Sequence, residues 1–510
     1  MRRLAAVVAV ALAATACSAS PAPSPSPSSK PGPDPMDRFT TQQLAWGPCA
    51  AYGQDDFEKQ AYADKSLECA SLTVPLDYAK PTGETVTVGL LRHRATDAAK
   101  RVGALVVDPG GPGGSGMMAA ASLVKPAGDL AKEFDFVGFD PRGVHASRPR
   151  ITCRSDAEQD ADRSSDIESD NSPAGVEKQL AEAKSYGASC VAHTGAEFLA
   201  HVGTREVVQD LDVLRAALGE PKLTYLGYSY GTQIGSAYAE AYPARVRAMV
   251  LDGAIDPAQD LPRSLITQTA GFQDAFTEFA KWCAPRSGCP LQGDATAAFQ
   301  RLVRPLVAKP VPARGGRKLS FEDAITGVTA ALYSRQRWGY LATGLQQLSQ
   351  GQGGNLLDLA DSYYERDQQG HYSGEIDAYF AVRCVDFARV TDRAAIDSAH
   401  AQMVAGAPFL AGGTPDTSEL DICSSWPVPP TSRAHQPAPP RGLPKVLVVS
   451  TTHDPATPYQ QGVDLAKDLG AALLTFEGTQ HTAFLSGSAC VDKAVGDYLR
   501  AGTAVDARCA

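Results

Sequence analysis

Short apolar runs alternate with amphipathic segments through the first half of the chain, and this alternation predicts the class of fold. The runs at 104–107, 134–139 and 247–251 are bounded by polar loops and have the length of buried strands. Between the second and third runs, residues 207–218 repeat apolar side chains at the spacing of a helix with one buried face. Strands that alternate with helices form a mostly parallel sheet with helices on both faces. We therefore expect an α/β fold.

The pattern changes after residue 256. Residues 257–441 carry helical periodicity and many aromatic side chains but few strand signals, and an apolar run at 445–450 then resumes the sheet pattern. This change predicts a core in two parts, 39–256 and 442–510, with a mainly helical cap inserted between them. We expect most aromatic rings of the cap to pack in its own core and a minority to line a substrate cavity.

Composition narrows the possible partners and cofactors. The 510 residues are 44 % hydrophobic and 20 % charged, which is typical of a globular protein with a large core. The formal net charge of −10 argues against nucleic acid or an anionic membrane surface as a partner. No histidine or cysteine cluster has zinc-ligand spacing, so we expect neither a metal nor another cofactor.

The N-terminus has the pattern of an export signal. Two arginines precede an apolar stretch at 4–14, which is too short to cross a bilayer. The small residues before Cys17 resemble a bacterial lipobox, although Ala14 stands where leucine is usual. We expect a signal peptide at 1–16 and a serine- and proline-rich tether at 17–38. Two outcomes stay open, namely membrane attachment through a lipid on Cys17 or release as a secreted protein.

Cysteine usage agrees with export. The chain has 11 cysteines, and ten remain if Cys17 carries lipid. Because no C-x-x-C pair is present, disulfides in an oxidising compartment are the better interpretation. Spacing alone does not determine the connectivity, and we predict local pairing. The predicted pairs are Cys49–Cys69, Cys153–Cys190, Cys283–Cys289, Cys384–Cys423 and Cys490–Cys509.

A serine lies between two glycines at the end of an apolar run. The run at 223–226 leads into Gly-Tyr-Ser-Tyr-Gly, centred on Ser229, and an alanine-rich helical segment follows. This G-x-S-x-G motif between a strand and a helix is the nucleophile elbow of α/β-hydrolases. Ser229 is therefore the predicted nucleophile. The N–H of Tyr230 is a predicted donor to the oxyanion.

A serine hydroxyl needs a histidine base, and this base needs a carboxylate that orients it. In α/β-hydrolases the chain order is serine, acid, histidine. Asp454 and His481 each follow an apolar run of strand length, and His481 is the only histidine after Asp454. We interpret His453, beside the acid, as an ordinary loop residue. The predicted triad is Ser229, Asp454 and His481.

A glycine-rich loop provides the second predicted oxyanion donor. Residues 109–116 follow the run at 104–107, where α/β-hydrolases place this donor. Glycines let the backbone approach a substrate closely. We expect the N–H of Gly111 to donate, with that of Gly110 as the alternative. A phosphate-binding loop is the competing interpretation, but no Lys-Ser/Thr follows and Pro112 lacks an N–H.

Eight short motifs stand in order along nearly the whole mature chain. They are Val74–Tyr78, Pro109–Gly116, Asp140–Val144, Asp210–Asp212, Gly227–Gly231, Val250–Gly253, Arg383–Asp386 and Asp454–Pro458. Together they resemble the secreted tripeptidyl aminopeptidases of actinobacteria, α/β-hydrolases related to proline iminopeptidase. The resemblance implies an α/β-hydrolase fold, a cap domain between the two halves of the core, and a family-typical C-terminal region that carries Asp454 and His481.

Three positions depart from the family pattern without removing a catalytic group. Asp108 stands where asparagine is commoner, His145 stands where glycine is usual, and Gln480 replaces a glycine before the histidine. These differences concern loop geometry and substrate preference.

Aminopeptidases of this kind recognise a free α-ammonium, which requires a carboxylate at a fixed distance from the nucleophile. Asp386 is our candidate, because a disulfide at Cys384 would hold it rigid; a structural salt bridge is the alternative interpretation. The leading hypothesis is an exported serine exopeptidase that releases short peptides from free N-termini through an acyl-enzyme. A secreted esterase or lipase with the same triad is the second hypothesis. A non-catalytic binding protein is the third, and the intact triad argues against it.

Overall fold

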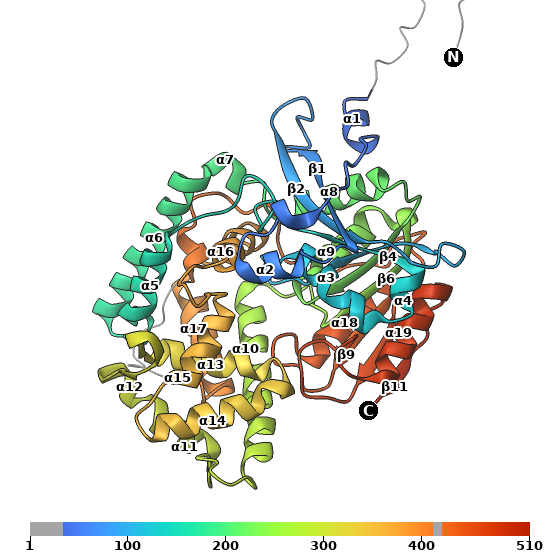
Figure 1. Ribbon diagram of the computed structural model, residues 1–510. Coiled ribbons are helices and arrows are strands. Elements are labelled where there is room, and N and C mark those ends of the chain that lie inside the picture. Colours follow the sequence, from blue (N-terminus) through green and yellow to red (C-terminus); the bar gives the residue numbers. More distant parts are fainter. Residues whose placement is uncertain (1–33, 412–420) are drawn as a thin grey trace, which may run out of the picture.

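The computed structural model describes residues 34–411 and 421–510. The predicted signal peptide, Cys17 and most of the predicted tether lie outside these described residues. A nine-stranded sheet forms the core, in the order β1-β2-β4-β3-β5-β6-β9-β10-β11 (Figure 1). β2 pairs antiparallel with β1 and β4, and all other neighbours are parallel, as the sequence predicts. The strands are β1 (Leu67–Pro75), β2 (Thr85–His93), β3 (Gly103–Asp108), β4 (Phe134–Phe139), β5 (Leu223–Tyr228), β6 (Val246–Asp252), β9 (Leu447–Thr451), β10 (Ala472–Phe476) and β11 (Ala507–Cys509).

The central strands are buried on both faces of the sheet. In β3, Ala104 and Val106 pack into one apolar cluster, whereas Leu105 and Val107 pack into the other. Two-sided burial is the reason that these strands read as continuous apolar runs in the sequence. The first face is covered by α8 (Thr204–Ala217), α9 (Tyr230–Ala241) and α18 (Tyr459–Leu469), and the second by α3 (Gly116–Ala127) and α19 (Ala489–Ala501).

A helical lobe is inserted between β6 and β9 and packs beside the sheet (Figure 1). Its own core is a cluster of buried rings that includes Phe276, Phe279, Phe299, Trp338 and Phe409. Tyr333, Tyr363 and Tyr379 instead line a cavity next to the core. The lobe contains α10 (Leu261–Cys283), α11 (Ala295–Val303), α12 (Pro305–Ala308), the ribbon β7 (Val311–Pro312) and β8 (Lys318–Leu319), α13 (Phe321–Leu332), α14 (Trp338–Ser349), α15 (Gly354–Tyr363), α16 (Glu375–Asp386) and α17 (Arg393–Gly406).

A second group of helices, which lies between β4 and α8 in the sequence, packs against this lobe (Figure 1). Arg163 of this group forms an ion pair with Asp323 at 2.8 Å, and the hydroxyl of Tyr186 donates to Asp377 at 2.5 Å. The lobe is therefore assembled from two separate stretches of the chain. The helices of the second stretch are α5 (Asp156–Ser165), α6 (Pro173–Thr194) and α7 (Ala196–Leu199).

The short N-terminal helices pack on the core. Phe39 of α1 (Asp37–Thr40) joins the apolar cluster on one face of the sheet, and α2 (Asp56–Ala61) packs against α3 on the other. A further short helix, α4 (Leu130–Glu133), precedes β4.

All five predicted disulfides are present. Cys49 is bonded to Cys69, Cys153 to Cys190, Cys283 to Cys289, Cys384 to Cys423, and Cys490 to Cys509. Each bond joins cysteines that are near neighbours in the sequence, and five bonds are typical of an exported protein. Within the described ranges, none of the helices has both the length and the apolar character that a membrane span requires.

Candidate active site

Ser229 occupies the sharp turn between β5 and α9. Its φ of 54° and ψ of −123° lie in a region that residues other than glycine rarely adopt. The flanking glycines are required by close packing. A Cβ on Gly227 would lie 2.4 Å from the carbonyl oxygen of Gly231, and a Cβ on Gly231 would lie 2.7 Å from that of Asp108. The turn has the strained geometry of a nucleophile elbow.

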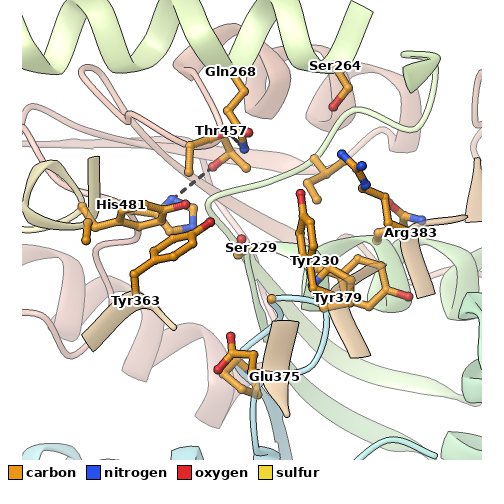
Figure 2. Close-up of a pocket in the computed structure, with 18 of the residues that line it drawn as sticks. Ser229, Tyr230, Ser264, Gln268, Tyr363, Glu375, Tyr379, Arg383, Thr457 and His481 are labelled. Atoms are coloured by element: carbon orange, nitrogen blue, oxygen red, sulfur yellow. Dashed lines mark hydrogen bonds between the residues drawn. The ribbon is translucent and has the colours of Figure 1, made fainter. Parts of the chain in front are cut away.

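The imidazole of His481 is held by Asp454. Nδ1 lies 2.8 Å from Oδ1 and 3.0 Å from Oδ2 of this buried carboxylate. The N–H groups of Ala456 and Thr457 donate to the same Oδ1 at 2.9 Å each. These contacts assign the proton of the neutral ring to Nδ1 and leave Nε2 as an acceptor. Among the described residues Nε2 has no hydrogen-bond partner, and it faces the cavity that Ser229 also lines (Figure 2).

Electrostatics favour the protonated form of His481. Burial lowers the pKa of the imidazole, but the charge of Asp454 and its hydrogen bond outweigh burial. Asp252 adds to this effect, and the pKa lies above the ordinary value of 6.5. The geometry and the charge together suit a base that accepts a proton at Nε2.

The glycine-rich loop after β3 lies directly against the elbow. A Cβ on Gly110 would stand 2.6 Å from the backbone nitrogen of Tyr230. Gly110 itself donates its N–H to Asp108 Oδ1 at 2.8 Å, so this N–H is already used inside the loop. Of the two predicted donors in the loop, the contacts therefore favour Gly111 over Gly110. Both Gly110 and Gly111 have positive φ, of 88° and 109°.

Asp386 reaches the cavity from the end of α16, but its oxygens already have donors. The hydroxyl of Tyr230 donates to it at 2.8 Å, and the N–H and hydroxyl of Thr204 donate at 2.8 and 2.6 Å. Burial raises the pKa of Asp386 to about 6, although these hydrogen bonds oppose the shift. The carboxylate thus anchors the side chain of the residue that follows the nucleophile.

A cavity of about 750 Å³ lies between the core loops and the lobe (Figure 2). The core contributes Ser229 and His481 to its lining, and the lobe contributes tyrosines and charged side chains. Figure 2 shows Glu375 and Arg383 at different sides of Ser229. The cavity therefore combines the predicted nucleophile with an acidic side chain and with Arg383, which pairs with Asp421 at 2.6 Å. The lining residues from the lobe include Tyr333, Tyr363, Glu365, Glu375, Tyr379 and Arg383.

Sequence reasoning missed a pair of acidic residues in this cavity. Glu375 begins α16 and Glu365 follows α15, and we call these two residues the carboxyl pair. Burial raises the pKa of Glu375 well above its usual range, and the charge of Glu365 and a hydrogen bond between the two groups add to the shift. A Cβ on Gly111 would lie 3.5 Å from Glu375 Oε1, so the pair adjoins the glycine-rich loop. Neither residue belongs to a recognised sequence motif. The two side chains come together only when the lobe folds.

Among the residues that the structure describes, one group of side chains could hold a metal ion. Asp274 and Glu278 of α10 lie close to His453, whose Nδ1 is 2.7 Å from Asp274 Oδ2. These side chains are partly exposed and contact the loop next to Asp454 rather than the cavity. His453 is thus a loop residue with an acidic partner, in agreement with its interpretation from sequence.

Comparison with known proteins assigns the fold and the reaction class. The family model described as "alpha/beta hydrolase fold" matches residues 103–488. The chain belongs to the α/β-hydrolase family. It is 46% identical over 475 residues to "Serine protease Hip1" of Mycobacterium tuberculosis, covering 91% of this chain and 89% of that protein. It is also 46% identical over 468 residues to "Carboxylesterase B" of the same species, with coverages of 90% and 88%. "Tripeptidyl aminopeptidase" of Streptomyces lividans is 31% identical over 477 residues, with coverages of 91% and 86%.

These relatives confirm the resemblance that the sequence motifs indicate, and they make this α/β-hydrolase a serine hydrolase.

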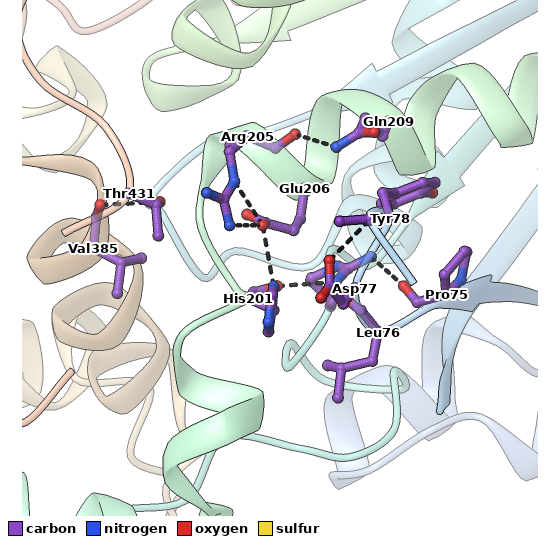
Figure 3. Close-up of polar contacts among 12 residues, drawn as sticks. Pro75, Leu76, Asp77, Tyr78, His201, Arg205, Glu206, Gln209, Val385 and Thr431 are labelled. Carbon is purple, nitrogen blue, oxygen red and sulfur yellow. Dashed lines mark hydrogen bonds and ion pairs between the residues drawn. The ribbon is translucent and has the colours of Figure 1, made fainter. Parts of the chain in front are cut away.

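Three of the motifs meet away from the cavity. Arg142, which is fully buried, donates to both oxygens of Asp210 and to the carbonyl groups of Pro75, Leu76 and His201. Figure 3 shows Pro75 and Leu76 close to His201, near the start of α8. In this α/β-hydrolase these motifs therefore support the fold rather than the chemistry.

Proposed function

We propose that this serine hydrolase is an exported exopeptidase that releases short peptides, tripeptides in the first instance, from free N-termini. The observation that carries the proposal is the carboxyl pair, which shares one cavity with Ser229 and His481. An acidic site beside a nucleophile suits a substrate whose reacting carbonyl lies a short distance from a free α-ammonium. The names of two relatives, a serine protease and a tripeptidyl aminopeptidase, agree with this activity.

Ser229, His481 and Asp454 act as nucleophile, base and orienting acid. Ser229 Oγ attacks the peptide carbonyl carbon while His481 Nε2 takes the hydroxyl proton. The N–H groups of Tyr230 and Gly111 receive the oxyanion, and one such donor lowers the barrier by about 3 kcal/mol. Collapse of the intermediate breaks the C–N bond, and the leaving amine takes the proton from Nε2. Water then hydrolyses the acyl-enzyme by the same route and releases the N-terminal peptide.

The carboxyl pair is the better receptor for the α-ammonium. Burial and the neighbouring charge of Glu365 raise the pKa of Glu375 well above its usual range, so the neutral form of Glu375 is favoured beside Glu365. An incoming α-ammonium would compensate the negative charge of the pair. Asp386, our candidate from sequence, already accepts three hydrogen bonds from Tyr230 and Thr204. We assign it the role of holding Tyr230.

The test compares a tripeptide anilide with its N-acetylated form. We expect kcat/KM of the wild-type protein to fall by at least about tenfold on acetylation, which removes one buried ion pair. The double variant Glu365→Gln/Glu375→Gln, which removes every charge of the pair, should abolish this preference, whereas Asp386→Asn, as the matched variant, should lower cleavage of both substrates alike. Ser229→Ala should remove all hydrolysis while the protein still folds. Equal cleavage of free and acetylated substrates by the wild-type protein would refute the exopeptidase proposal.

A secreted esterase is the second candidate, because one 46%-identical relative is named a carboxylesterase. In that case kcat/KM for a short-chain nitrophenyl ester would exceed that for the tripeptide anilide, and Glu375→Gln would leave ester hydrolysis unchanged. Mass spectrometry of products from a peptide library counts the residues released per cut.

We further propose that Cys17 carries the lipid that attaches the exported protein to the membrane. A fatty-acid label that is present in the wild-type protein and absent from Cys17→Ser would support this attachment.

A further inference from the structure

His145 lies in the loop after β4. Its φ of 37° falls in the left-handed region, which favours glycine over a histidine. The side chain is only 6 % exposed. A buried histidine with a strained backbone, outside the proposed triad, needs contacts that stabilise it. The neighbours of the ring provide such contacts.

The two ring nitrogens of His145 face carboxylates from different parts of the chain. Nδ1 lies 2.9 Å from Oε1 of Glu58, a buried residue of α2. Nε2 lies 3.7 Å from Oε2 of Glu365 in the lobe. Burial alone disfavours the charged ring, but Glu58, Asp140 and Glu365 outweigh it and raise the pKa of His145 to about 9. The surrounding carboxylates therefore favour the imidazolium form of a ring that lies between the core and the carboxyl pair.

We infer that His145 is a positioning residue, which holds Glu365 against Glu375 so that the carboxyl pair can receive the α-ammonium of the substrate. This inference rests on the proposed exopeptidase function. It adds a determinant of substrate recognition that lies behind the pair, on the side facing α2.

The charges around the pair explain why a cation is needed there. Two neighbouring carboxyl groups repel each other, and burial of one of them favours its neutral form. The side chain of Glu365 is 39 % exposed, so without a partner it is free to turn into solvent. A second cation, Arg150, lies beside Gly374, because a Cβ on Gly374 would stand 2.8 Å from its guanidinium. Among the described residues, the ion pair of Glu365 is with His145, at 3.7 Å.

Glu58 gives the imidazolium a rigid support. Its Oε2 accepts the N–H of Gln54 at 2.7 Å, and its own N–H donates to Asp55, which caps α2, at 2.7 Å. His145 holds the pKa of Glu58 below its usual range, although burial acts in the opposite direction. The ion pairs of His145 with Glu58 and with Glu365 thus link an N-terminal helix to the carboxyl pair in the cavity.

The experiment uses the full-length protein with the free and acetylated tripeptide anilides. His145→Gly suits the backbone, since glycine adopts this φ without strain, and His145→Asn tolerates it well. For both variants we expect KM for the free substrate to rise about fivefold, the effect of losing one partly screened ion pair. The kcat for this substrate and both constants for the acetylated one should stay within about twofold. Glu58→Gln should shift KM in the same direction by a smaller factor.

The outcomes separate this inference from the proposed function. If the wild-type protein cleaves both substrates equally, the exopeptidase proposal itself is wrong. If the wild-type protein prefers the free substrate and both His145 variants keep that preference unchanged, the role of His145 is wrong. A parallel loss of activity on both substrates, with a lower melting temperature, would make His145 a purely structural link to α2 and would also overturn the inference.

Discussion

The backbone carbonyl of Asp252 accepts a hydrogen bond from the N–H of Ser229 at 2.9 Å. The carboxylate of the same residue accepts the N–H groups of Ala483 and Phe484, at 2.9 and 2.7 Å through Oδ2. A single residue at the end of β6 therefore connects the turn that carries the nucleophile with the loop that carries His481. Burial raises the pKa of Asp252 to about 7, and the hydrogen bonds from the loop oppose this shift.

Asp252→Ala should reduce both stability and turnover. The substitution leaves two buried N–H groups without an acceptor, which costs roughly 2–5 kcal/mol of the free energy of unfolding. Because the loop of His481 loses its anchor, kcat should fall more than KM rises. Urea denaturation and steady-state kinetics measure the two effects. Asp252→Asn keeps one acceptor oxygen and should be affected less; equal effects of Ala and Asn would show that the carboxylate does not order this loop.

Asp454→Asn tests the orientation of the base. The amide does not hold the Nδ1 proton of His481 in place, so kcat should fall by about 10⁴-fold while KM changes little. His453→Ala is the matched control, since His453 is adjacent in sequence but pairs with Asp274 outside the cavity. Its kcat should stay within about twofold of the wild-type value. A comparable loss in both variants would assign the effect to loop disruption.

The pH dependence follows from the raised pKa of His481. The base must be neutral to accept the proton of Ser229, so kcat/KM should rise with pH along a limb centred above 6.5. An ester substrate, which carries no titrating amine, isolates this limb. Asp454→Asn removes the charge that raises the pKa, and the residual activity should show the limb at lower pH. A limb that does not move would contradict this source of the shift.

The raised pKa of His481 in the folded state also affects stability. The imidazolium stabilises the folded protein below pH 6.5, and this contribution is lost as the pH rises through the folded-state pKa.

The Cys384–Cys423 disulfide should matter for substrate recognition as well as stability. It closes a loop of 39 residues and fastens α16, which carries Glu375 and Asp386. Removing both cysteines should lower the free energy of unfolding by about 3–4 kcal/mol and raise KM for a free N-terminus. Removing Cys490–Cys509, which lies away from the cavity, should cost a similar stability without changing KM. Thermal unfolding and kinetics of the two double variants distinguish local from general effects.

Several features of this protein follow from its sequence alone, because they depend on local pattern. Continuous apolar runs gave the parallel strands, since a strand buried on both faces has no polar side. The G-x-S-x-G turn located Ser229, and the order of loops after late strands located Asp454 and His481. The cysteines pair with near neighbours, so their bonds could be predicted from proximity in the chain.

Only the tertiary structure decided which charged groups meet. Nothing in the local sequence of α5 and α6 indicates that these helices pack against a lobe whose own helices follow β6 in the chain. Glu58, His145, Glu365 and Glu375 come from separate segments, and nothing in their local sequence indicates their contact. Burial and mutual charge, which set the pKa of Glu375 and His145, exist only after these segments have packed together. The chain order therefore determined the proposed chemistry at Ser229, whereas packing determined the surroundings that we propose to select its substrate.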